Sequence, residues 1–324
     1  MKRADRCRIL HSFLWTRAWA GGLCLLCLSS ARLSAQPLVP GTGQKATKSS
    51  DDFEDPKWAY KYNLPKGSYE NDKDQRTPAG LSANNRWFEG GLRGQPDVVK
   101  RVDTPPGGLP GSTGSLLMQS RDTGVPGSYS YKFQQDDLIA NVIQLERGAL
   151  PVSWSPSVVV RVYMPTWDQW EQRTGTSFGF RISCMTHKMG RSGGRRGRMI
   201  NEEEQYWPGM FMQFNKGDGQ KVKDSATLLL RGGPSGHDFA GAKITNVPAW
   251  WTLGLSVTPD GQVHYYGHEG VEDLSEKDRL SSQFPYGYHA ERVDTFFFDI
   301  ISGDNGSLST PWIIDDATLY YNRH

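Results

Sequence analysis

The sequence predicts an all-β fold, a two-sheet antiparallel sandwich, on three observations. Many short runs alternate apolar with polar residues, and Gly, Pro, Asn, Asp and Ser separate them. Only one short segment, "LSEKDRLSSQ" (274–283), carries a convincing helix signal, with Ser275 as the cap and Asp278 three positions on. Strands that follow one another without intervening helices favour antiparallel pairing over a parallel sheet.

The amino-terminal end predicts an exported protein. Basic residues precede the apolar run "AWAGGLCLLCL" and small residues follow it, so residues 1–35 are interpreted as a secretory signal peptide cut after Ala35. The run is too short to predict a membrane span. Residues 36–51 are rich in Pro, Gly, Ser and Lys, which predicts a flexible leader. One sandwich domain is expected over 52–324, in a protein secreted to the extracellular space or the periplasm.

Removal of the signal peptide changes the charge and the cysteine content. It takes six of the 37 Lys and Arg and one of the 35 Asp and Glu, so the remaining chain carries a net charge of −3. This charge gives no reason to expect nucleic acid as a partner. Cys184 is then the one cysteine left, which excludes an internal disulfide. It alternates with Phe178, Phe180 and Ile182, so we interpret it as a buried thiol.

Eight segments are predicted to form the sandwich. They cover residues 115–120, 157–165, 177–185, 209–215, 226–232, 250–270, 295–302 and 312–321. The segment 250–270, "WWTLGLSVTPDGQVHYYGHEG", is a hairpin. A three-residue loop with Gly261 in the left-handed region pairs Val257 with Val263 and Leu255 with Tyr265. A two-residue loop would mix polar and apolar groups on both faces, so the first register is favoured.

The alternation also predicts which side chains turn away from the core. Burial of the apolar residues in each strand leaves Arg, Gln, His, Tyr and Asp on the opposite face. These types pair planar donors with ring surfaces, which suits sugars and carboxylates. We expect them on a single sheet face, and the alternative is that they scatter over different sheets or lie under a loop. The residues are Arg161, Tyr163, Arg181, Gln213, His264, Tyr266, His268 and Asp299.

Three stretches together resemble the concanavalin A-like lectin and glucanase jelly rolls. They are the hairpin, the opening "DFEDPKWAYKYN" and the closing "WIIDDATLYY", which looks like a last strand lying beside a first one. The resemblance covers residues 51–324 in pattern and implies a jelly-roll sandwich that uses its concave sheet face. Because sugar-binding modules, hydrolases and lyases share this fold, the fold does not choose among them.

The motifs favour carbohydrate binding and leave lyase activity open. The Glu-x-Asp-x-Glu strand of retaining glucanases is missing, so hydrolysis of that type is not expected. A lyase acting on uronate-containing glycans would use Arg181 and Gln213 on the carboxylate, and His264 or Tyr266 for proton transfer. The alginate-lyase signatures Gln-Ile-His and Tyr-Phe-Lys-Ala-Gly-x-Tyr are absent. The third alternative is a structural or cell-surface interaction protein.

Three further features bear on ligands. Trp167 and Trp170 occupy a loop where they could stack on sugar rings or anchor the loop. The Gly-rich basic loop 187–199 could contact an anionic polysaccharide or be a solvated insertion. The resemblance implies a structural calcium ion where first and last strands meet, with hard oxygen ligands from Glu54, Asp55, Asp315 and Asp316. No other cofactor is expected.

Overall fold

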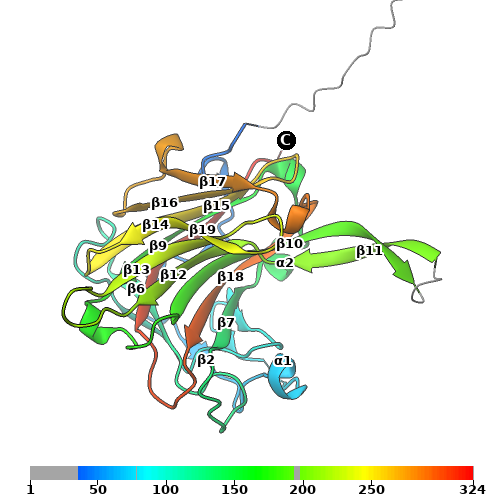
Figure 1. Cartoon of the computed structure of the whole chain (residues 1–324). Helices are drawn as coiled ribbons and strands as arrows, with labels where there is room; N and C mark the ends of the chain where they lie inside the picture. Colours follow the sequence, from blue (N-terminus) through cyan, green and yellow to red (C-terminus); the bar gives the residue numbers. More distant parts are fainter. Residues whose placement is uncertain (1–35, 78, 193–197, 324) are drawn as a thin grey trace, which may run out of the picture. The chain divides into compact units, whose positions relative to one another are not determined.

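Two antiparallel sheets face each other across one core in the computed structural model (Figure 1), which describes residues 36–77, 79–192 and 198–323. The predicted signal peptide and part of the basic loop lie outside the described residues. The predicted all-β sandwich is therefore confirmed. None of the helices in these residues is long and apolar enough to cross a membrane.

The first sheet has eight strands within the described residues. In spatial order they are β17 (Arg279–Gln283), β16 (Val263–Glu269), β15 (Ala249–Val257), β9 (Ser157–Met164), β19 (Trp312–Tyr321), β6 (Gly114–Gln119) and β5 (Val98–Asp103), with β1 (Gln44–Lys45) paired to β19.

The second sheet has eleven strands within the same residues. In spatial order they are β14 (Asp238–Ile244), β13 (Ser225–Arg231), β12 (Gly209–Asn215), β10 (Ser177–Ser192), β18 (Arg292–Ser302), β7 (Gln134–Ala140), β4 (Trp87–Glu89), β3 (Leu81–Ser82) and β2 (Tyr60–Lys61); β11 (Arg198–Tyr206) pairs with β10, and β8 (Leu150–Pro151) pairs with β18.

Helices are short and lie in the connections. They are α1 (Tyr69–Asp72), α2 (Val142–Leu145) and the 3-10 turns η1 (Val152–Trp154), η2 (Trp167–Gln169), η4 (Glu276–Asp278) and η5 (Pro285–Gly287). The helix predicted over 274–283 is thus a single turn. Its capping box is present, with Ser275 and Asp278 hydrogen-bonded, but the chain then continues as β17, which pairs with β16.

The core lies between the sheets and is built by the alternation that the sequence shows. From the first sheet come Val158, Val160, Val162, Leu253, Leu255 and Tyr265; from the second come Phe178, Phe180, Ile182, Met210, Met212, Phe296 and Phe298. Burial of these side chains removes their apolar surface from water, which is the main favourable term in folding. Cys184 is fully buried, and burial raises the pKa of its thiol, as expected for a structural cysteine.

The hairpin has the predicted register. Val257 pairs with Val263 and Leu255 with Tyr265, and Gly261 has φ +80°. The apolar side of β15 and β16 therefore faces the core, and His264 and Tyr266 turn to the outer face of the first sheet.

Residues 36–51 differ from the expectation of a flexible leader. Gln44 and Lys45 pair with β19, and the Ser256 hydroxyl donates to the Leu38 carbonyl at 2.6 Å. This segment, rather than 53–62, lies beside the closing strand, because Asp51 bridges to Ala317 while Tyr60 and Lys61 join the second sheet. We call residues 36–45 the N-terminal strap.

Candidate functional site

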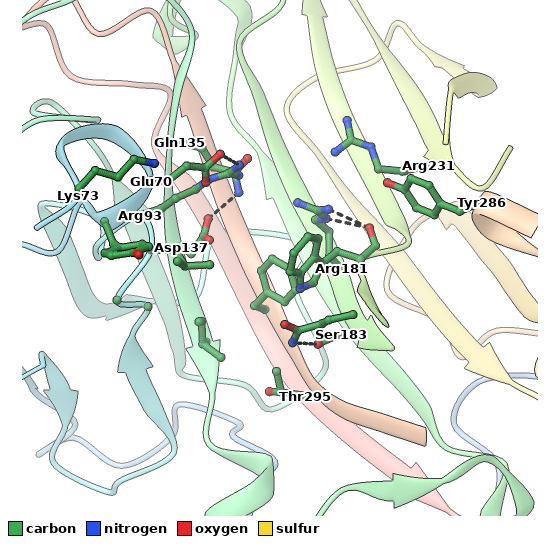
Figure 2. A pocket seen from close by; sticks show the side chains of 18 residues that line it. Glu70, Lys73, Arg93, Gln135, Asp137, Arg181, Ser183, Arg231, Tyr286 and Thr295 are labelled. Carbon is green, nitrogen blue, oxygen red and sulfur yellow. Dashed lines mark hydrogen bonds and ion pairs between the residues drawn. The ribbon is translucent and has the colours of Figure 1, made fainter. Parts of the chain in front are cut away.

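A groove lies on the outer face of the second sheet. Its volume is about 620 Å³, within the usual range for ligand sites. Strands β7, β18, β10 and β13 form its floor, and residues from the loop after β4, α1 and η5 form its walls. Figure 2 shows Glu70, Lys73, Arg93 and Gln135 on one side and Arg231 and Tyr286 on the other.

One carboxylate, that of Asp137, lines the floor of this groove, and a second, that of Asp299, is buried beside it. Asp299 on β18 is directly opposite Asp137 on β7, and Gly179 on β10 is on the other side of Asp299. A Cβ on Gly179 would come within 2.8 Å of both Asp299 Oδ2 and the Phe211 ring. Because Gly179 has no side chain, the Asp299 carboxylate and the Phe211 ring can both lie close above its backbone.

The Asp137 and Asp299 carboxyls titrate as a pair. Asp299 is fully buried and Asp137 is 9% exposed. Burial raises the pKa of both carboxyls, and the charge of Asp299 raises the pKa of Asp137 further. Arg93 and Arg181 oppose this shift. Two adjacent carboxylates cannot both ionise cheaply, and this repulsion adds to the effect of burial at Asp137.

Arg181 fixes the floor beside this pair. Its Nη1 lies 3.3 Å from Asp299 Oδ2, and its Nε and Nη2 donate to the Trp207 carbonyl at 3.2 and 2.9 Å. The guanidinium also lies 5.2 Å from the centroid of the Phe297 ring. These contacts bury Arg181 and orient it by both charge and stacking.

The walls carry further paired cations. Arg93 donates to both Glu70 oxygens, one of them at 2.8 Å, and these hydrogen bonds lower the pKa of Glu70. Arg231 is bidentate to Asp238 at 2.8 and 2.9 Å and lies 4.6 Å from the centroid of the Phe211 ring. Each of the arginines in the groove is thus held in a defined orientation.

Arg181 is the predicted site residue that lines the groove, and Asp299 is buried beside it as its ion-pair partner. Gln213 lies on the same outer face, opposite Ser177 and Thr227, but does not line the groove. Sequence reasoning missed Arg93, Glu70 and Asp137. The first two come from a loop and a one-turn helix, and no pattern in the sequence places them opposite β18.

The expectation of one shared face was wrong for five residues. Arg161, Tyr163, His264, Tyr266 and His268 lie on the first sheet, and Arg181, Gln213 and Asp299 lie on the second. Alternation tells which side of a strand points outward, but both sheets of a sandwich have an outer face. The alternative of separate sheets is therefore the correct one.

The outer face of the first sheet is also covered. His264 and Tyr266 are fully buried, because the N-terminal strap and the segment 270–278 cross over them; Val39 and Leu274 pack around Tyr266. His264 Nδ1 lies 2.7 Å from the Ser282 hydroxyl and its Nε2 lies 2.9 Å from the Thr258 hydroxyl. Neither side chain can reach a substrate in this arrangement, so their predicted catalytic roles are withdrawn.

The other residues predicted on this face have structural partners. Arg161 is 4% exposed and pairs with Asp273 at 2.7 Å and Asp316 at 2.8 Å. His268 Nδ1 lies 3.2 Å from Asp278, and the Tyr163 ring packs 5.4 Å from that of Trp250.

Trp167 and Trp170 anchor their loop in the core instead of facing a ligand. Trp170 is 2% exposed, donates its indole N–H to the Pro165 carbonyl at 2.8 Å, and packs edge-on against Trp312. Trp167 packs on Trp170 and Phe214. Of the two roles considered for this pair, the anchoring one fits these contacts.

The four carboxylates considered for calcium have protein partners. Glu54 accepts from Thr113, Asp55 from the Lys57 amide, Asp315 from Ser112, and Asp316 from Arg161. The described residues contain no group of three or more His, Cys, Asp or Glu side chains that could hold a metal ion. Calcium binding stays a prediction from the resemblance.

The described ends of the basic loop, 187–192 and 198–199, belong to two long paired strands. Strands β10 and β11 pair as far as Ser192 and Arg198, and the pair projects beyond the rest of the sheet (Figure 1). Lys188 pairs with Glu204 at 2.6 Å, which offsets part of the loop's positive charge.

No protein-family model matches the chain, and no curated protein matches it. Several solved structures are similar in fold. A carbohydrate esterase from Shiga toxin-encoding bacteriophage phi24B has 10% identity and TM-score 0.40, over 74% of this chain and 91% of that one. The GH131 beta-glucanase catalytic domain from Podospora anserina has 10% identity and TM-score 0.38, over 81% and 87%.

An alginate lyase from Pseudomonas aeruginosa also matches, with 10% identity and TM-score 0.33, over 65% of this chain and 83% of that one. Likenesses at this identity concern the fold alone. The chain is a two-sheet antiparallel β-sandwich.

Proposed function

We propose that this chain is a secreted protein that binds polysaccharide in the groove of the second sheet. The observation that carries the proposal is the lining of the groove: oriented guanidinium and amide donors lie beside aromatic rings, over buried carboxyls whose pKa is raised. Sugar rings present hydroxyls, which both donate and accept, and apolar C–H faces, which stack on aromatic rings. Export rests on the predicted signal peptide.

The charge of the groove supports a neutral or weakly anionic chain. Each groove arginine is already paired, with Glu70, Asp299 or Asp238. The raised pKa of Asp137 and Asp299 disfavours negative charge on the floor, and Lys73 at the rim adds one positive charge. The groove can therefore bind a polysaccharide that contains a uronate, but its charge does not require a negative ligand.

A specific observation keeps lyase activity as the second candidate. Tyr286 stands on the groove wall near Arg231 (Figure 2) and has φ +60°, a strained conformation for a residue with a side chain. In a lyase, the deprotonated tyrosine oxygen would accept the proton from C5 of a uronate whose carboxylate lies against arginine. The C5–H electrons would form the C4–C5 double bond, the C4–O bond would break, and the tyrosine would return the proton to the leaving oxygen.

Affinity electrophoresis of the mature protein in gels containing alginate, pectate, xylan or laminarin tests binding. Retardation by at least one of them is expected, and Trp207→Ala should abolish it. Trp154→Ala is the matched control, a half-buried tryptophan that packs on Tyr321 away from the groove.

The same polysaccharides, followed by the ultraviolet absorbance of unsaturated uronate, separate the two candidates. Retardation without product supports a binding protein. Product formation that Tyr286→Phe abolishes supports a lyase. A chain that none of the four polysaccharides retards would contradict both and leave a structural or cell-surface role.

A further inference from the structure

A second, smaller hollow adjoins the groove. It has a volume of about 250 Å³ and shares Glu70, Arg93 and Gln135 with the main cavity. Ile301 lies on its floor, two residues beyond Asp299 on β18. Successive outward residues of a strand are about 6.6 Å apart, so the two hollows follow one another along β18, with the Arg93–Glu70 ion pair between them.

An exposed aromatic ring forms the far wall of this hollow. Phe133 is 45% exposed, and the Arg173 guanidinium lies 4.3 Å from the centroid of its ring. The ring also lies close over Gly175, where a Cβ would come within 2.7 Å of Phe133 Cζ. Arg173 is itself held, because it donates to the carbonyls of Gly303 and Tyr131. The ring is thus supported from behind while almost half of it faces solvent.

We propose that this hollow is an outer subsite, in which Phe133 stacks against a further sugar ring of the polysaccharide that fills the groove. The proposal rests on the proposed function. The apolar C–H face of a pyranose fits the Phe133 ring, and the amides of Asn71, Gln134 and Gln135 are hydrogen-bonding groups for its hydroxyls.

The charges around the hollow select a neutral sugar. Arg93 is the one cation among the residues that line it, and both oxygens of its partner Glu70 accept from that guanidinium. A uronate placed here would meet the Glu70 carboxylate, while Arg173 is held against the Phe133 ring and donates to the Gly303 and Tyr131 carbonyls. The outer ring is therefore uncharged, even where the groove itself accepts a uronate.

Oligosaccharides of graded length test the subsite. Calorimetric titrations with laminari-, cello- and mannuronate oligomers, from disaccharide to octasaccharide, should show wild-type affinity rising with length until the outer subsite is filled. Phe133→Ala should weaken binding of the longest neutral oligomers about five- to tenfold and leave the shortest binding oligomer unchanged. Phe133→Tyr, which keeps the ring, should restore affinity.

Tyr131→Ala is the matched control, since Tyr131 is an exposed aromatic residue of the same loop that lines neither hollow. Equal losses in Phe133→Ala at all lengths, no loss at any length, or the same loss in Tyr131→Ala would overturn the outer subsite while leaving the groove proposal intact. A wild-type protein that binds no oligomer of any length would instead overturn the proposed function, and the subsite with it.

Discussion

Asp137 and Asp299 lie directly opposite each other on neighbouring strands, and both are buried under the groove that arginines surround. Their separation is set by the pairing of β7 with β18, where Cβ atoms of opposed residues are about 5 Å apart. This separation is about that of the two carboxyls of a retaining glycosidase. Asp299, however, is fully buried and does not line the groove, so the pair does not fit the roles of nucleophile and acid in hydrolysis.

Asp299→Asn should lower the pKa of Asp137. The substitution keeps the shape of the side chain and removes the neighbouring charge, which is the second cause of the raised pKa; burial, the first cause, remains. The pKa of Asp137 should therefore fall but stay above its ordinary value. Carboxyl carbon NMR titration measures it. Asp294→Asn, on the same strand but outside the groove, is the control. If the pKa of Asp137 is unchanged in Asp299→Asn, the two carboxyl groups do not interact.

Arg181→Met should destabilise the protein by about 3 kcal/mol, because it leaves the Asp299 carboxylate buried without its cation. The double variant Arg181→Met with Asp299→Asn should recover a large part of this loss, since the uncompensated charge is gone. Urea unfolding of the four proteins measures the coupling free energy. If the two substitutions have additive effects on the free energy of unfolding, the interaction between Arg181 and Asp299 contributes nothing to stability. Polysaccharide in the gel should no longer retard Arg181→Met or the double variant.

The sequence predicted the strands that have one apolar face. The segment 209–215 is β12 and 312–321 is β19, with the bounds expected, because in each the inward residues are uniformly apolar. The hairpin register followed from the same rule. The predicted residues Arg181 and Asp299 were correctly assigned to outward positions, since their strand neighbours Phe180 and Phe298 fill the core.

Strand β7 was missed because a carboxylate interrupts its inner face, which also carries Leu138 and Ala140. Asp137 points into the groove, whereas Asp136 points inward and is fully buried, where Lys66 Nζ lies 2.6 Å and the Ser120 hydroxyl 2.6 Å from its Oδ2. A buried carboxylate with partners far away in sequence breaks the alternation that signals a strand. Half of the carboxyl pair therefore could not be found from the sequence.

Strand β11 was missed for a different reason. It belongs to a hairpin that extends past the other strands, so its side chains are not required to be apolar on either face. Its pairing with β10 is held by cross-strand ion pairs such as that of Lys188 with Glu204.

Gly254→Val should displace the N-terminal strap. A Cβ at this position would come within 2.8 Å of the Pro40 ring and 2.4 Å of Leu274, and the rigid proline ring cannot move away without the backbone. We expect a loss of about 1–3 kcal/mol in the free energy of unfolding and faster proteolysis of residues 36–45. Mass spectrometry of limited digests measures the cleavage.

Ser256→Ala is the graded control for the strap, because it removes only the hydrogen bond to the Leu38 carbonyl and should increase cleavage less. If the strap of Gly254→Val resists proteolysis as well as that of the wild type, the strap does not pack against Gly254 as these distances indicate. Polysaccharide binding should be unchanged in both variants, since the strap covers the sheet opposite the groove.

Protonation of His264 should make the protein less stable in acid. Burial lowers the pKa of His264 from 6.5 to about 4. Between these values the unfolded imidazole binds a proton and the folded one does not, so the unfolded state gains protons and the free energy of unfolding falls as the pH drops from 6.5 to 4. The full effect of this one residue is about 3 kcal/mol.

His264→Gln removes the titrating group and should flatten the pH dependence in that window, as measured by urea unfolding at a series of pH values. His237→Gln, at an exposed position, should keep the wild-type slope. A wild-type slope in His264→Gln would mean that His264 stays accessible to protons, and that the strap and segment 270–278 do not close over it.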